Sequence, residues 1–422
     1  MIQKGEHSMN YLVVPKPLFT SEMEARGYIM SAQYGNALIE LAKSNPLDRS
    51  MNSLFIDFIK DVGLAALTQD KMVFIPVTNI HLMTNLEEGL NEEYENFVFV
   101  LDEYVEPTDL VIDRIARFCK LRFKFAVTYI GNIDSLRPFI PYTDYIVVKI
   151  PSEYIRVHAR ELSRQFPRIT TIAPEIDDKL VFDTIKHNTT HLFGGPFYKV
   201  HISKSSRRTA LSPLRVNYIS LLNVVNNKDF DFDNFTNTIR QDPALAMQFM
   251  KLINNTGRIK SEITNLNQAA AMLGQVEIKK WVSTAVSNAL CADNPSEVMR
   301  LSLIRARFCE NMARHFELSM SADNLFVMGL FSTLDIVLEM PIEEALMLVF
   351  VPAKIHDALT DGTGEYAEVL NFIKEYELGN WHEISRLALL RNITISDIHL
   401  AYKGALQWYN DLIHQEVEIE NV

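Results

Sequence analysis

Eight short β-rich runs, most of them separated by amphipathic helical stretches, occupy residues 11–200. The runs are rich in Val, Ile, Phe and Tyr, which strands favour. They stand at 11–14, 27–32, 72–77, 97–101, 123–128, 145–150, 169–173 and 191–195. Such alternation indicates a (βα)-barrel or a large doubly wound sheet. Because no helix-length gap separates the first two runs, we expect an antiparallel start.

One intervening stretch, "TDLVIDRIARFCKL" at 108–121, carries clear helix signals. Thr108 follows a proline and is a residue type that caps helix N-termini. Apolar side chains recur with helical spacing, and we expect Leu110, Ile112, Ile115 and Phe118 near one face. The sequence therefore predicts an amphipathic helix covering the sheet.

From about residue 209 the β-rich runs disappear and apolar residues recur with a period of 3.6. Asp242-Pro243 predicts a helix start, with aspartate as the cap and proline in the first turn. We therefore expect a barrel at 9–200, a basic linker at 201–215 and an all-α domain at 216–422.

The boundary region carries basic residues without an acid between them, namely Lys199, Lys204, Arg207, Arg208 and Arg215. Such a cluster could bind a phosphate ligand, meet the acidic stretch at 85–97, or be solvated. We favour the two structural interpretations over ligand binding.

Composition and charge exclude several classes of protein. The net charge is −12, from 41 basic and 53 acidic residues, which argues against sequence-independent nucleic-acid binding. Cys119, Cys291 and Cys309 are widely spaced and are typical of a cytoplasmic protein with reduced thiols. No apolar run approaches the roughly 18 residues of a membrane span, and the first ten residues lack the apolar core of a signal peptide.

The predicted strand ends offer few groups for catalysis. The acids there are Asp102, Glu103, Glu175 and Asp177. They could hold one metal ion, but solvated loop acids are the favoured interpretation. No dinucleotide-binding glycine motif, phosphate-binding loop, nucleophile elbow or zinc-protease motif is present. "DGTGEY" at 361–366 is interpreted as a surface loop because no strand precedes it.

His356-Asp357 is a literal His-Asp pair. With His315 before it and Asp397 after it, the order resembles that of an HD metal phosphohydrolase. A two-residue match arises easily by chance, and the surrounding "AKIHDALTDG" is typical of a short exposed helix. We therefore interpret the pair as part of a surface helix.

The order of segments resembles the bacterial EAL–HDOD family, in which a cyclic di-GMP phosphodiesterase-like EAL barrel precedes an all-α HDOD domain. The resemblance covers the chain from Met9. It is carried by "MNYLVVPKPLFTSEMEARGYIMSA", "IRQDPALAMQFMKLINN", "AAAMLGQVEIKKWV", "FVMGLFSTLDIVLEMPIEEAL" and "ELGNWHEI" in combination. The implied fold is a (βα)8-type barrel with an antiparallel first strand, followed by a helical HD-like domain.

Carried over residue by residue, the resemblance implies that the EAL metal ligands are replaced. The family's ligand positions hold Ile29, Pro76, Val100, Thr128, Tyr129, Pro151 and Pro174, with Asp177 as an approximate companion, and the glutamine near the last strand becomes Phe193. Only Lys149 remains. Two-metal hydrolysis needs these oxygen ligands. We therefore expect no catalytic residue, no bound metal and no cofactor, and leave the ligand-binding residues open.

The helical half departs from the HD pattern in a similar way. Ser332 and Thr333, in "GLFSTLDIV", stand where an HD phosphohydrolase has His and Asp. The preceding helix offers Arg305 and Arg307 in place of a metal-binding histidine. We expect a buried helix in which the two hydroxyls bond to backbone carbonyls.

The resulting expectation is a protein that is not an enzyme, an inactive signalling adaptor in a cyclic di-GMP-related pathway. Its partners would be bacterial signalling proteins, and a homodimer stays open. A non-hydrolysing cyclic di-GMP receptor is one alternative. Residual cyclic di-GMP phosphodiesterase or HD-type hydrolase activity is the other.

Overall fold

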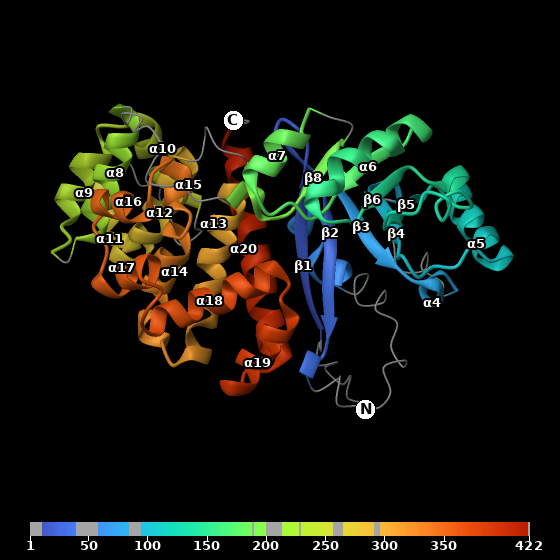
Figure 1. Ribbon diagram of the computed structural model, residues 1–422. Coiled ribbons are helices and arrows are strands. Elements are labelled where there is room, and N and C mark those ends of the chain that lie inside the picture. The colour runs from blue at the N-terminus through green and yellow to red at the C-terminus, as the bar shows by residue number, and fades with distance from the viewer. Residues whose placement is uncertain are drawn as a thin grey trace, which may run out of the picture. The chain divides into compact units, whose positions relative to one another are not determined.

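The computed structural model describes residues 11–38, 58–83, 94–187, 190–199, 213–227, 229–255, 265–290 and 296–420. Eight strands close into a barrel in chain order (Figure 1). They are β1 Tyr11–Phe19, β2 Ala25–Tyr34, β3 Met72–Val77, β4 Phe97–Leu101, β5 Lys124–Tyr129, β6 Tyr145–Val148, β7 Thr170–Ala173 and β8 Leu192–Gly194. The expected (βα)8-type barrel is confirmed.

The antiparallel start is also confirmed. β1 pairs antiparallel with β2, placing Lys16 opposite Ile29, and it closes the barrel by pairing antiparallel with β8. All other neighbours are parallel. The five residues between β1 and β2 are enough for a hairpin, whereas a parallel partner needs a crossover of a dozen or more residues.

The barrel interior is filled by apolar side chains. Every second residue of a strand faces inward, and the core cluster consists of Leu18, Phe74, Val98, Val100, Ala126, Val147, Ile172 and Leu192. Ile29 packs against the same cluster. The end of the barrel at which the parallel strands β2–β8 finish is called the mouth below. It is the end at which enzymes with this architecture carry their active sites.

Helices of the barrel half connect the strands. They are α3 Leu64–Thr68, α4 Asn79–Leu82, α5 Asp109–Lys120, α6 Ser152–Gln165 and α7 Lys179–Ile185, with short 3-10 turns at Tyr94–Asn96, Ile140–Tyr142 and Pro196–Lys199. Thr108 caps α5 by accepting the Val111 amide at 3.4 Å. The buried face differs from the expected one: it consists of Val111, Ile115 and Phe118, and Leu110 is 67% exposed.

The second half of the described chain is helical, as expected. Its helices are α8 Pro213–Asn226, α9 Phe232–Ile239, α10 Pro243–Asn255, α11 Leu266–Leu273, α12 Gln275–Leu290, α13 Ser296–Met312, α14 Ala322–Phe331, α15 Leu334–Leu338, α16 Ile342–Leu348, α17 Ala353–Thr360, α18 Glu365–Leu378, α19 Trp381–Leu390 and α20 Ile395–Glu420, with 3-10 turns at Ala313–Phe316 and Ser319–Ser321. Asp242 accepts the Leu245 amide at 3.1 Å and caps α10.

The chain forms two compact units whose boundaries differ from the expected ones. One unit contains the barrel within Met1–Val200 together with Phe372–Val422, and the other is His201–Asn371. The last fifty residues pack on the barrel because they bond to its first strands. The Tyr376 hydroxyl donates to the Val13 carbonyl at 2.8 Å, and the His399 ring lies edge-on to Tyr11 at 4.9 Å. Within the described residues, no helix is long and apolar enough to cross a membrane.

Candidate functional site

An ion pair between two strand ends stands at the mouth. Lys149 directly follows β6, and its Nζ lies 2.7 Å from Oε1 of Glu103, which follows β4. This hydrogen bond raises the pKa of Lys149, and Asp102 and Glu175 add to the effect. Burial alone would raise the pKa of Glu103, but the bond from Lys149, a backbone hydrogen bond and the charge of Lys149 together outweigh it, and the pKa falls below its usual range. Both groups are therefore charged at neutral pH.

A second lysine at the mouth was not identified from the sequence. Lys16 lies on β1 opposite Ile29 and shares the inward-facing parity of Leu18. Its side chain is partly buried, and within the described residues its ammonium has no hydrogen bond or ion pair. Burial lowers the pKa of Lys16, and Glu175 partly opposes this shift. The available signal was a cation inside an otherwise apolar strand, "LVVPKPLF".

Most of the replaced EAL positions lie at or just after strand ends, whereas Ile29 lies in the middle of β2. Thr128 Oγ1 donates to the Leu101 carbonyl at 2.7 Å, and the Tyr129 hydroxyl pairs with His158 Nδ1 at 2.7 Å. Phe193 is fully buried on β8 and packs against Phe182 at 5.1 Å. Both hydroxyls are therefore engaged by protein groups. The remaining positions are apolar: Ile29, Pro76, Val100, Pro151 and Pro174.

The residues at the mouth do not fit the two-metal site that the EAL fold implies. Among the described residues, no group of three or more His, Cys, Asp or Glu could hold a metal ion. Glu103 is engaged by an ammonium, and Asp102 accepts the Tyr104 amide at 2.9 Å. We therefore derive no chemical step through a metal. The expectation that the chain has no catalytic or metal residue stays a prediction.

The "GLFSTLDIV" stretch packs tightly against α13. A Cβ at Gly329 would lie 2.7 Å from Ala306 Cα and 2.9 Å from the Arg305 carbonyl oxygen, so glycine allows the two helices to approach. Ser332 Oγ donates to the Gly329 carbonyl at 2.6 Å, and Thr333 Oγ1 contacts the Leu330 carbonyl at 3.5 Å. The expected bonds from these hydroxyls to backbone carbonyls are present.

Arg305 contacts the position at which HD hydrolases carry a histidine. Its guanidinium donates to Ser332 Oγ at 2.7 Å, and the arginine is only 4% exposed. Ser302 Oγ on the same helix donates to the Leu330 carbonyl at 2.8 Å. A buried protein cation and two hydroxyls thus make internal hydrogen bonds between α13 and α14.

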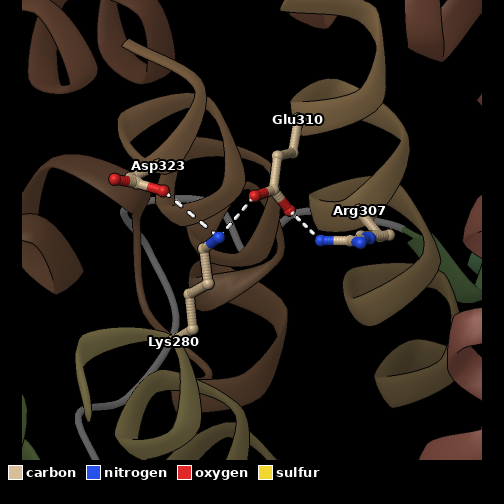
Figure 2. A network of polar contacts seen from close by, with 4 residues as sticks. All are labelled: Lys280, Arg307, Glu310 and Asp323. Carbon is tan, nitrogen blue, oxygen red and sulfur yellow. Dashed lines mark hydrogen bonds and ion pairs between the residues drawn. The ribbon is translucent and has the colours of Figure 1, made fainter. Parts of the chain in front are cut away.

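Arg307, two residues further along α13, joins a separate ionic network (Figure 2). Its Nη1 lies 2.6 Å from Glu310 Oε2, and the other oxygen of Glu310 lies 2.6 Å from Lys280 Nζ. Lys280 also reaches Asp323 at 3.2 Å. Burial opposes the charge on Lys280, but the bonds and charges of Glu310 and Asp323 together outweigh it and raise the pKa of Lys280. The network joins α12, α13 and α14.

The literal His-Asp pair lies on an exposed helix. The side chains of His356 and Asp357, both on α17, are 46% and 55% exposed. Asp397 belongs to the start of α20, where its carboxylate accepts the Thr394 amide at 3.2 Å and Thr394 Oγ1 accepts the Asp397 amide at 3.1 Å. The loop at 361–366 borders a hollow of about 350 Å³ lined by Lys354, Asp357, Thr363, Gly364, Glu365 and Tyr366. Lys354 is paired there with Glu365 at 2.5 Å.

Part of the basic boundary region can be placed. Lys199 Nζ lies 3.4 Å from Glu377 Oε2, so this cation meets an acid outside the stretch at 85–97. Lys204, Arg207, Arg208 and the side chain of Arg215 lie outside the described residues.

Of the three cysteines, Cys291 lies outside the described residues and Cys309 is buried. Burial raises the pKa of Cys119 to about 11, so its thiol is not a nucleophile at neutral pH.

Comparison with known proteins finds relatives that align with both halves of the chain. Residues 211–348 match the HDOD domain family. The uncharacterized protein YuxH of Bacillus subtilis is 24% identical over 96% of this chain and 99% of its own length. The cyclic di-GMP phosphodiesterase CdgJ of Vibrio cholerae is 23% identical over 95% of this chain and 92% of its length. A standalone EAL protein from Vibrio cholerae O395, solved with c-di-GMP bound, is 18% identical over 44% of this chain and 90% of its own, with a TM-score of 0.33.

The expectation that the chain is not an enzyme is wrong in the light of these comparisons. CdgJ, which aligns with 95% of this chain, is named a cyclic di-GMP phosphodiesterase. Substitution at the family's ligand positions therefore does not justify assigning the chain to a non-enzymatic class. Residues 211–348 thus form an HDOD domain, and with the eight-stranded barrel before it and the two full-length relatives the chain has the organisation of the EAL–HDOD proteins.

Proposed function

We propose that the barrel binds cyclic di-GMP at its mouth and that the chain is a cyclic di-GMP phosphodiesterase of the EAL–HDOD type. The alignment with CdgJ over nearly the full length of both chains carries this proposal. A relative that shared only the HDOD domain would say nothing about the barrel. Here the alignment spans the barrel and the helical domain together.

The charges at the mouth support a phosphate-bearing ligand. Lys149 and Lys16 both lie near Glu175, whose charge adds to the rise in the pKa of Lys149 and partly offsets the lowering of the pKa of Lys16 by burial. Two ammonium groups at one barrel end attract an anion with two phosphodiester groups. The chain as a whole carries a net charge of −12, so this pair of cations differs from the average charge of the molecule.

The binding step is tested with the purified full-length chain and cyclic di-GMP in a calorimetric titration. Lys149→Met removes one charge-assisted contact, worth about 1.5–3 kcal/mol, and we expect affinity to fall by roughly tenfold or more. Lys186→Met is the matched control, because Lys186 also pairs with a carboxylate, Asp183, at 2.6 Å. It lies at the end of α7, away from the strand ends, and its loss should leave affinity within about twofold.

The hydrolytic step is tested by chromatography of the same samples in Mg²⁺ or Mn²⁺. We expect linear dinucleotide to accumulate. Binding without product would restrict the function to recognition. The absence of both heat and product at tens of micromolar nucleotide would refute the proposal.

A further inference from the structure

A turn from the C-terminal end of the chain lies against the β1–β2 hairpin at the mouth. α18 ends at Leu378, and Gly379 has φ of +70°, the left-handed conformation that ends helices. A Cβ at Gly379 would lie 3.1 Å from Ser31 Oγ and 3.3 Å from Lys16 Nζ. Because glycine has no side chain, the turn can approach the Lys16 ammonium and the Ser31 hydroxyl this closely.

The turn is held in place from behind. The Trp381 indole N–H donates to Ser31 Oγ at 3.3 Å, and its ring packs edge-on against Tyr376 at 5.5 Å. The Tyr376 hydroxyl in turn bonds to the Val13 carbonyl on β1. Three aromatic and backbone contacts thus fix the turn relative to Lys16. A site held in this way binds a ligand without first being ordered.

Lys16 is an unusual cation for a barrel interior. A partly buried charge costs free energy unless a counter-charge or hydrogen-bond partner offsets it. The described chain offers Lys16 only the nearby Glu175, without a bond. Lys149, by comparison, has its own carboxylate at 2.7 Å. An anion from outside the chain would give Lys16 the partner that it lacks.

We propose that Lys16, Ser31 and the Gly379–Trp381 turn form a phosphate-binding subsite of the mouth, so that the segment after the HDOD domain contributes to ligand recognition. The ligand class is a phosphodiester or pyrophosphate anion. The identification of that anion as cyclic di-GMP rests on the proposed function. Lys16 supplies the charge, Ser31 a hydroxyl donor, and Gly379 the close approach of the turn to both.

Substitution of Lys16 separates a ligand-binding role from a structural one. Lys16→Gln removes an unpartnered charge, so the melting temperature of the ligand-free chain should stay equal to wild type or rise. Its affinity for cyclic di-GMP should nevertheless fall at least tenfold. Lys16→Arg keeps the charge, so its affinity for cyclic di-GMP should remain within about threefold of wild type. The affinity of the control Lys186→Gln should stay within the same range. A lower melting temperature with unchanged affinity would overturn the proposal.

Protection of Lys16 from acetylation provides a second readout that does not require cyclic di-GMP. The full-length chain is acetylated with and without cyclic di-GMP or inorganic pyrophosphate, and modification is quantified by peptide mass spectrometry, with Lys354 as the reference. We expect either anion to slow modification of Lys16 at least threefold and to leave Lys354 unchanged.

The two experiments distinguish failure of the subsite from failure of the proposed function. If cyclic di-GMP binds and neither Lys16→Gln nor acetylation responds, the subsite is refuted and the proposed function stands. If cyclic di-GMP does not bind but pyrophosphate protects Lys16, the proposed function fails and the phosphate subsite stands. If neither anion protects Lys16, the subsite is refuted.

Discussion

The hydrogen bond from Arg305 to Ser332 can be tested quantitatively for its contribution to the stability of the helical unit. Arg305 is 4% exposed, and its guanidinium donates to Ser332 Oγ at 2.7 Å. Ser332→Ala removes one acceptor of a buried charged donor, which costs about 1.5–3 kcal/mol. For a unit of this size, each kcal/mol lowers the melting temperature by about 2–4 °C. We expect a decrease of about 3–12 °C in the HDOD-containing unit.

Ser302→Ala is the matched control for this substitution. It deletes a hydroxyl of the same kind from the same α13–α14 interface, where Ser302 donates to the Leu330 carbonyl at 2.8 Å. Both partners in that bond are neutral, so its loss should cost about 1 kcal/mol. In an Arg305→Met background the charge is gone, and the cost of Ser332→Ala should drop to a similar value.

The measurement is urea unfolding of the full-length chain followed by tryptophan fluorescence. Trp281 lies on α12, whereas Trp381 and Trp408 lie in the barrel-containing unit. Replacing the latter two by phenylalanine leaves Trp281 as the only reporter, and it reports on the helical unit. A cost below 0.5 kcal/mol for Ser332→Ala (about one third of the smallest expected value), or one that persists without the Arg305 charge, would refute the assignment.

Three further outcomes follow from local geometry. Gly329→Ala gains about 1 kcal/mol of helix propensity but places a Cβ 2.7 Å from Ala306 Cα, so overpacking should leave the helical unit about 1–2 kcal/mol less stable in urea unfolding. Thr108→Ala should cost the barrel about 0.5–1 kcal/mol in a thermal melt, because the cap bond is 3.4 Å long. Burial lowers the pKa of His81 to about 4, and its Nδ1 accepts the Thr78 amide. The unfolded chain then binds the extra proton, so stability should fall by about 2 kcal/mol between pH 7 and 5, with the NMR signal of His81 still that of a neutral ring.

The existence and type of most elements could be predicted from local patterns. The run at 72–77 became β3, and Asp242-Pro243 begins α10 as expected. These signals succeed because alternation, capping and proline geometry act within a few residues. The buried face of α5 was predicted only in part: Leu110 is exposed and Val111 is buried instead. A short apolar pattern does not fix which of two neighbouring residues faces the sheet. The burial of α5 depends on the sheet beneath it.

The chemistry of the candidate site was less accessible from the sequence. Lys149 was identified because it follows a strand, but Lys16 reads locally as one charge between two prolines. Its importance comes from barrel closure, which turns β1 residues of one parity inward. The residue-by-residue comparison also led to the wrong prediction that the chain is not an enzyme. A full-length relative is named a phosphodiesterase, whereas the aligned ligand positions suggested no activity.

The sequence by itself determined a (βα)8-type barrel followed by helices, since both periodicities are local properties of the chain. Only the tertiary structure returned residues 372–422 to the barrel and brought Gly379 and Trp381 beside Lys16 and Ser31. These contacts join residues about 350 positions apart, as in Trp381 to Ser31. An apolar stripe indicates that a helix buries one face, but it does not indicate which other element will cover that face. That choice is made by packing of the whole unit, and it placed the C-terminal turn at the mouth.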